Sequence, residues 1–213
     1  MKVNKLLRGI LCSMLCLTTL VGCSGENLYE KAEAQTLDYN GTIISIEPDD
    51  DMTKGNAESA IKLIKSQPAY LLKNCTTLHW QGNEVFVQNA MEYGFGETEA
   101  KEINGFHSEG EIFLNGRDKY QSSISITDED KKSVMTHELW HTYDWKNGNG
   151  NQYISEMQIL DLYNQSPNSI SEYGATNIYE FFAEAGAMYI NNPEELKERN
   201  MDLYNYFETL PKE

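Results

Sequence analysis

The stretch THELWHTYD, residues 136–144, is the most informative part of this 213-residue chain. It carries two of the four histidines, and it places His137 and His141 four residues apart. Residues four apart on a helix share one face, so both imidazoles can reach a single metal ion. Glu138 can hold a water molecule bound to that ion without being a ligand itself. The alternative is an ordinary polar helix face that happens to carry two histidines and an acid.

The residues on either side of this stretch predict the helix that it needs. Thr127 precedes Asp128, Glu129 and Asp130. A threonine at that position can accept hydrogen bonds from the first free amides of a helix, and acids in the first turn suit the positive end of the helix dipole. The Asn- and Gly-rich residues 147–150 then end the helix. The motif therefore lies on a helix with a defined start and stop.

A third metal ligand is expected downstream of the motif. A catalytic zinc ion usually takes three protein ligands and leaves a fourth position for water. The other histidines, His79 and His107, lie upstream without motif spacing, and we expect His79 to be structural or exposed. Glu180 and Glu184 lie four apart in a predicted helix among apolar residues, where acids are costly unless paired or coordinated. The alternative for these two acids is a surface stripe of carboxylates.

The combination of these features resembles a known family. A His-Glu-x-x-His motif is followed by a helix containing Glu-Phe-Phe-Ala-Glu, and Tyr173 stands seven residues before the first of those acids. This pattern resembles the lethal-factor-like zinc metallopeptidases, which include the catalytic domain of anthrax lethal factor and the secreted bacterial Pro-Pro endopeptidases. The match covers residues 127–190. It implies an α+β, zincin-like fold, in which a small mixed sheet with helices lies above an active-site helix and a mostly helical C-terminal part.

The resemblance also implies a role for each site residue. It implies one zinc ion per chain, bound by His137, His141 and Glu180, which is the gluzincin type of ligand set. It further implies Glu138 as the general base, Tyr173 as the donor to the oxyanion and Glu184 as an acid that orients a ligand histidine. The expected activity is that of a zinc metalloendopeptidase acting on a protein or peptide substrate.

The remaining elements are predicted from hydrophobic periodicity and turn residues. We expect strands over residues 41–47, 76–80, 84–87 and 111–114, helices over 56–66, 152–164 and 177–191, and a helical pair from 193 toward 210. Residues 94–110 are expected to be irregular and exposed. A zincin substrate lies extended along an edge strand, for which 111–114 is the candidate. The alternative is that this strand is fully paired within the sheet.

The first residues of the chain predict export. Residues 1–22 combine a cationic start with a short apolar run, as secretory signals do, and the sequence Leu-Val-Gly before Cys23 resembles a lipobox. We expect a lipid at Cys23, a flexible tether over residues 23–40 and a metallopeptidase domain over residues 41–213. The alternative is ordinary signal cleavage that leaves Cys23 free. Cys75 would then be the only other mature cysteine, so no disulfide framework is expected.

The charge of the chain restricts its partners. The formal net charge is −16, and removal of the three cations in residues 1–22 makes it −19. A chain this acidic is a poor candidate for binding nucleic acid or anionic lipid headgroups. Any membrane attachment would therefore come from the lipid alone. We expect a monomer that binds its substrate in an extended form.

Three functions are compatible with these features. The first is a lipid-anchored zinc endopeptidase on the outer face of the bacterial cytoplasmic membrane, or on the periplasmic side in a Gram-negative cell. The second is a non-catalytic surface-binding lipoprotein with a structural zinc ion, which would leave Glu138 and Tyr173 without a role. The third is a zinc amidase that acts on cell-wall peptide crosslinks.

Overall fold

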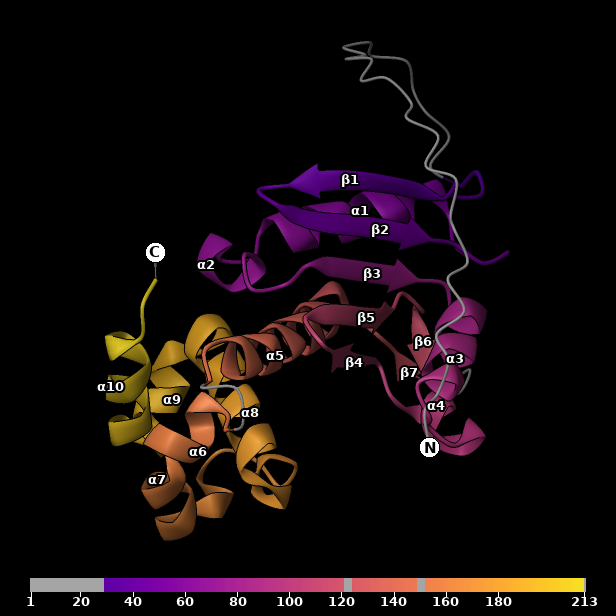
Figure 1. Cartoon of the computed structure of the whole chain (residues 1–213). Helices are drawn as coiled ribbons and strands as arrows, with labels where there is room; N and C mark the ends of the chain where they lie inside the picture. The colour runs from indigo at the N-terminus through magenta and orange to yellow at the C-terminus, as the bar shows by residue number, and fades with distance from the viewer. Residues whose placement is uncertain (1–28, 121–123, 149–151, 213) are drawn as a thin grey trace, which may run out of the picture.

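A five-stranded mixed sheet lies beside the long helix that carries the His-Glu-x-x-His motif (Figure 1). A computed structural model describes residues 29–120, 124–148 and 152–212. The sheet order is β1-β2-β3-β5-β4, with bounds Gln35–Tyr39 for β1, Thr42–Glu47 for β2, Thr77–Gln81 for β3, Gly105–Ser108 for β4 and Glu111–Asn115 for β5. The three central strands run parallel, and β1 and β4 are antiparallel to their neighbours at the two ends of this order.

Helices connect the parallel strands, because a parallel pair requires a crossover. The first crossover, from β2 to β3, contains α1 (Lys54–Lys65) and α2 (Ala69–Leu72). The second, from β3 to β5, contains α3 (Asn83–Glu92), α4 (Glu97–Glu102) and the strand β4. A capping box formed by Thr53 and Asn56 starts α1, which buries Ala57, Ala60 and Ile64 on one face.

The two faces of the sheet support two separate cores. Ile44 of β2 and Leu114 of β5 join the larger core, to which Trp140 of the motif helix also belongs. Phe113 points to the other face and packs with Phe86 of α3 in a smaller, aromatic core. The strands alternate between these cores, as the two-residue period of a strand requires. The motif helix therefore packs against the face of the sheet that carries the larger core.

The C-terminal part of the described chain is helical. It contains α5 (Asp128–Lys146), α6 (Ile154–Gln158), α7 (Leu160–Gln165), α8 (Ile178–Asn191), α9 (Pro193–Arg199) and α10 (Met201–Thr209), and the short hairpin of β6 (Lys119–Tyr120) and β7 (Ile124–Ser125) precedes α5. The helices α5 and α8 pack directly on each other. Gly186 permits this approach, because a Cβ atom there would lie 2.4 Å from Cγ of Trp140.

Several predicted features agree with this architecture. The α+β class and the small mixed sheet are confirmed. The helix α5 begins after Thr127, whose side chain accepts a hydrogen bond from the amide of Asp130 in a capping box. The predicted helix over 177–191 corresponds to α8, and the final pair corresponds to α9 and α10.

The folded region begins earlier than predicted. Residues 35–39, which we expected to belong to a flexible tether, form β1 and pair with β2. Ala32 is also buried, with 5% of its surface exposed. Asn40 and Gly41 have positive φ angles of 56° and 88°, as expected of an Asn-Gly hairpin turn, and this turn brings β1 back onto β2. The expected signal, residues 1–22, and Cys23 lie outside the described residues.

Three further predictions need correction. Residues 84–87 lie in α3 and not in a strand, because Phe86 and Ala90 bury one face of a helix. Residues 94–110 are not irregular, since they contain α4 and β4. Residues 111–114 belong to β5, which pairs with β3 on one side and β4 on the other. The candidate substrate strand is therefore internal, and β4 takes the end position in the sheet.

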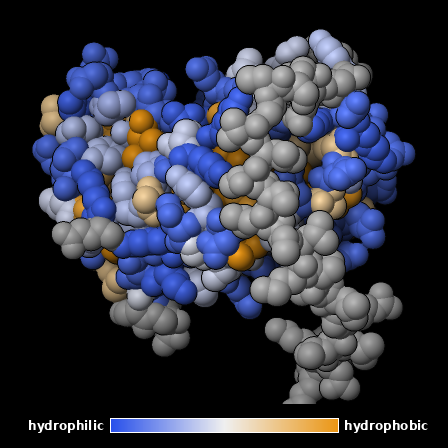
Figure 2. Space-filling view, turned by 90° about the horizontal axis from the view of Figure 1, so that it is seen from above, coloured by the Kyte–Doolittle hydropathy of each residue, from blue (hydrophilic) through white to orange (hydrophobic). Residues whose placement is uncertain are grey.

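One face of the molecule is mainly hydrophilic (Figure 2). Figure 2 shows a face covered mainly by hydrophilic residues, with hydrophobic residues in small patches. Within residues 29–120, 124–148 and 152–212, no helix has the length and apolar character needed to cross a membrane.

Candidate metal centre

Three side chains from α5 and α8 converge on one point. The Nε2 atoms of His137 and His141 lie 2.9 Å apart. Oε2 of Glu180 lies 3.0 Å from Nε2 of His137 and 3.2 Å from Nε2 of His141. Both histidines are buried, with 8% and 6% of their surfaces exposed. The packing of α5 on α8 therefore brings together the three residues that the sequence nominates as ligands.

The spacing of these atoms fits a zinc ion. Ligand atoms about 2.0–2.1 Å from a tetrahedral zinc ion lie about 3.3 Å from one another. The three observed distances need only a small expansion to reach that value. Two imidazole nitrogens 2.9 Å apart also need a proton or a cation between them, because two lone pairs repel each other. The set of two nitrogens and one carboxylate oxygen is one that zinc accepts.

Helix capping places the carboxylate ligand. The side chain of Asn177 accepts hydrogen bonds from the amides of Tyr179 and Glu180 and so starts α8. Glu180 then lies in the first turn, where the helix dipole favours a negative charge. Glu184 follows one turn later on the same face. The two acids therefore face α5 together and do not form a surface stripe.

Glu184 contacts the ring of a candidate ligand. Its Oε1 atom lies 3.0 Å from Nδ1 of His137. A carboxylate in that position accepts the Nδ1 proton, which leaves Nε2 free to bind a metal ion. Its Oε2 atom accepts a hydrogen bond from Ser171, at 2.8 Å. The sequence carries no signal for Ser171, because a serine in a loop belongs to no metal-site motif.

His107 is a second residue that sequence analysis did not assign to the site. It lies on β4, where Nδ1 is 3.5 Å from Oε2 of Glu138 and the ring stacks on His141 with centroids 4.7 Å apart. His107, Glu138 and His141 thus form an alternative set of possible ligands, with ligand atoms within 4.8 Å of one another. The set of His137, His141 and Glu180 is tighter, and Glu184 orients one of its rings, so we favour it as the metal centre.

The electrostatics of the centre favour a positive charge. Burial opposes the charge on His137, but the hydrogen bonds to Glu180 and Glu184 outweigh it and raise the pKa of His137 to about 10. Burial also opposes the charge on Glu138, and here the neighbouring histidines His107, His137 and His141 outweigh it and lower the pKa of the carboxyl group. Glu138 is therefore held as a carboxylate, able to accept a proton.

Tyr173 lies at the mouth of the centre. Its ring centroid is 5.9 Å from that of His137, and 57% of its surface is exposed. It lines a cavity of about 320 Å³ together with His137, Glu138 and Glu184. Burial of the hydroxyl, followed by the carboxylates of Glu180 and Glu138, raises the pKa of Tyr173 above its ordinary value. The hydroxyl therefore keeps its proton and can act as a donor.

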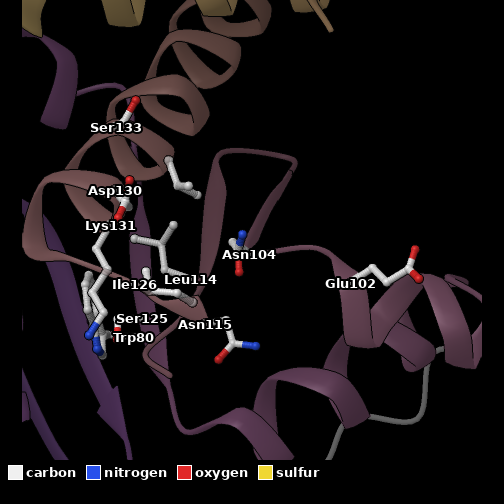
Figure 3. A pocket seen from close by; sticks show the side chains of 11 residues that line it. Trp80, Glu102, Asn104, Leu114, Asn115, Ser125, Ile126, Asp130, Lys131 and Ser133 are labelled. Carbon is white, nitrogen blue, oxygen red and sulfur yellow. The ribbon is translucent and has the colours of Figure 1, made fainter. Parts of the chain in front are cut away.

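A larger cavity adjoins this one. It has a volume of about 540 Å³ and lies beside the first half of α5 (Figure 3). Its apolar walls include Trp80, Leu114, Ile126 and Val134. Val134 also lines the smaller cavity, so the two cavities share a wall. A recess with both apolar and polar walls therefore adjoins the candidate metal centre.

The pair of helices carries a group of side chains that could hold a metal ion. A family comparison identifies the chain as a metallopeptidase, since residues 39–210 match the model described as glucose-regulated metallo-peptidase M90. The chain belongs to that family, because the match covers most of its length. No curated protein matches the sequence. The family supports the predicted zinc metallopeptidase class, but it does not extend to the narrower lethal-factor-like resemblance.

Proposed function

We propose that the protein is a zinc-dependent endopeptidase that hydrolyses peptide bonds of extracytoplasmic proteins or peptides. The observation that supports this proposal is the convergence of His137, His141 and Glu180 within 3.2 Å, with Glu138 one residue after the first histidine. This arrangement corresponds to a gluzincin-type ligand set with an adjacent general base.

Each of the chain's own residues has a defined task in this proposal. His137, His141 and Glu180 would hold the zinc ion, which would supply a Lewis acid for a water molecule and for the peptide carbonyl group. The carboxylate of Glu138 accepts the proton of the attacking water and passes it to the leaving amine. The hydroxyl of Tyr173 donates to the developing oxyanion, and one such donor contributes about 3 to 4 kcal/mol.

The substrate is proposed to bind along β4 in an extended form. This strand lies at the end of the sheet order and packs against α5. An extended peptide can add to such a strand through backbone hydrogen bonds. A large apolar side chain of the substrate would enter the cavity of about 540 Å³, whose walls include Leu114 and Val134. Backbone pairing would thus give affinity, and this cavity would give selectivity.

The location of the enzyme is a further part of the proposal. The lipobox-like sequence before Cys23 supports a lipid anchor on the outer face of the bacterial cytoplasmic membrane. The net charge of −16 makes nucleic acid an unsuitable partner. We propose that the protein acts as a monomer tethered to the membrane by its lipid.

The variant Glu138→Ala tests the proposal. It removes the proton acceptor but no ligand, so it should keep one zinc ion per chain and lose peptidase activity by several orders of magnitude. The matched control is His137→Ala, which should lose the metal as well. Zinc content and cleavage of a peptide library, with and without a chelator, would be measured for both. If Glu138→Ala cleaves at the parental rate, the mechanism is wrong. If the parent protein binds zinc but cleaves nothing, the metal is structural.

A further inference from the structure

Ser171 occupies the middle of a hydrogen-bonded chain that ends at the metal centre. Its hydroxyl donates to Oε2 of Glu184 at 2.8 Å and accepts from the amide of Gly174 at 2.8 Å. The other oxygen of Glu184 lies 3.0 Å from Nδ1 of His137. The chain therefore runs from the backbone of Gly174 through Ser171 and Glu184 to a candidate metal ligand.

The direction of every bond in this chain is fixed. An ionised carboxylate can only accept, so Glu184 takes one proton from Nδ1 of His137 and another from the hydroxyl of Ser171. A hydroxyl has a single proton, which Ser171 has then used. Its lone pair remains to accept the amide proton of Gly174. The hydroxyl thus satisfies two groups at once, and it holds the carboxylate whose other oxygen accepts the Nδ1 proton of His137.

The same hydroxyl anchors the turn that presents Tyr173. The amide of Ala175 donates to the carbonyl of Ser171 at 3.1 Å. The amide and the hydroxyl of Thr176 donate to the carbonyl of Tyr173, at 3.0 and 2.7 Å. Tyr173 itself is 57% exposed, and its ring contacts that of His137 with centroids 5.9 Å apart. The backbone turn over residues 171–176 therefore acts together with this ring contact to place Tyr173 above the centre.

The turn also lies close to the acid. A Cβ atom on Gly174 would lie 3.1 Å from Oγ of Ser171 and 3.5 Å from Cβ of Glu184. A methyl group there would meet Glu184 at an ordinary van der Waals distance and Ser171 more tightly, so the turn lies beside both side chains. Loss of the Ser171 hydroxyl therefore removes one hydrogen bond to Glu184 and one from the turn that carries Tyr173.

We propose that Ser171 is a positioning residue that joins the orientation of His137 to the placement of Tyr173. The inference rests on the proposed function, since it assigns the ligand role to His137 and the donor role to Tyr173. Its two effects are separable. Loss of the hydroxyl frees one oxygen of Glu184 and weakens zinc binding, and it loosens the turn that carries Tyr173 and lowers kcat without altering KM.

The test compares Ser171→Ala with Ser171→Thr and Ser169→Ala. Ser171→Thr keeps the hydroxyl and should restore the parental behaviour. Ser169→Ala removes a nearby hydroxyl that bonds only Asn200, among the bonds described, and should leave zinc binding and turnover unchanged. Ser171→Ala should bind zinc about 3- to 10-fold more weakly in competition with a chelator, less than the effect of about 10- to 100-fold expected for losing Glu184 itself. The kcat of Ser171→Ala should fall about 10-fold, and its KM should stay within about twofold of the parental value.

Double variants then show whether Ser171 acts through Glu184 and Tyr173 or independently of them. Adding Ser171→Ala to Glu184→Gln should weaken zinc binding no further, and adding it to Tyr173→Phe should lower kcat no further. The inference would be overturned if Ser171→Ala bound zinc as tightly as the parent. It would also be overturned if the losses in zinc binding and in kcat were fully additive in the two double variants. Zinc competition requires no substrate, so it tests Ser171 even if the parent protein proves to have no peptidase activity.

Discussion

The hydroxyl of Tyr173 carries the first prediction at the scale of single residues. Tyr173→Phe keeps the ring beside His137 and removes one donor. Its kcat should fall by roughly a hundredfold with little change in KM, as expected for a group that acts mainly in the transition state. Steady-state kinetics on one cleaved peptide, with zinc content measured in parallel, checks this. Turnover at the parental rate would assign this tyrosine to another role.

Asp144 carries the second residue-scale prediction, which concerns pH. It is fully buried and accepts hydrogen bonds from the amide and the hydroxyl of Ser155, both at 2.7 Å. Burial raises the pKa of Asp144 to about 6, although the hydrogen bonds from Ser155 oppose this rise. Glu156 adds a smaller increase, and His107 a smaller decrease.

Because its pKa is raised on folding, Asp144 makes the free energy of unfolding fall as the pH increases. The folded pKa lies above the unfolded value of about 3.9, so the folded state binds more protons than the unfolded state in between. The contribution of Asp144 to the free energy of unfolding is therefore greatest below about pH 4, and it is lost as the pH rises through about 6. Asp144→Asn should gain stability relative to the parent across this interval, by about 2 to 3 kcal/mol at most. Urea unfolding of both proteins at several pH values measures it, and a constant difference would contradict it.

Sequence periodicity finds residues that share one helix and misses those brought in by other elements. His137, Glu138 and His141, and likewise Glu180 and Glu184, could be predicted because a spacing of four on a helix fixes a common face. His107 could not be predicted, since it lies on a separate strand, β4, that the fold brings to Glu138. Ser171 could not be predicted either, because its role depends on a backbone turn that no spacing encodes.

At the scale of elements, the contact between α5 and α8 determines how the ligands meet. Gly186→Ala would place a methyl group 2.4 Å from Cγ of Trp140, in a helix pair with no space to accept it. We expect a loss of about 1 to 3 kcal/mol of stability and weaker zinc binding, because the helices must separate. Chemical denaturation and chelator competition measure the two effects.

The control for this variant is Gly96→Ala, where an added Cβ atom meets nothing within 4 Å. It should leave both stability and zinc affinity close to the parental values. Equal effects of the two substitutions would show that the contact between Gly186 and Trp140 does not control the helix spacing.

The elements of the sheet show where sequence prediction failed. Residues 35–39 carry only Leu37 and Tyr39 as large apolar side chains, so hydrophobic periodicity does not separate them from a tether, yet the Asn-Gly turn that follows them is a strong hairpin signal. The helix at 83–92 contains the expected strand 84–87, because a short apolar run does not distinguish a helix from a strand. The order of β4 and β5 depends on long-range pairing, which periodicity does not contain.

At the scale of the whole molecule, zinc removal should lower thermal stability. An ion that binds the folded chain and not the unfolded one stabilises it by mass action, by about 2.7 kcal/mol at a hundredfold excess over the dissociation constant. We expect the Tm of the parent to fall on chelation and to recover with zinc. His141→Ala should show no such response. A Tm independent of zinc in the parent would contradict a site between α5 and α8.

The lipid anchor is tested on intact cells. A Cys23→Ser form should leave the membrane fraction and appear in the soluble extracellular or periplasmic fraction, still folded and still cleaving the same peptides. Fractionation followed by immunoblotting, with Cys75→Ser as the control, measures the distribution. Equal membrane retention of Cys23→Ser and the parent would mean that the lipobox is not used.

The ligands of the metal centre are far apart along the chain, and this has a consequence for its resistance to cleavage. His141 and Glu180 are separated by 39 positions, and the segment between them holds α6 and α7. A bound ion would close this segment into a loop and remove much of its chain entropy, as a disulfide does in other proteins. Opening of α6 and α7 would then gain less chain entropy while the ion is bound. Other proteases should therefore cut within this loop when zinc is scarce and spare it when zinc is abundant.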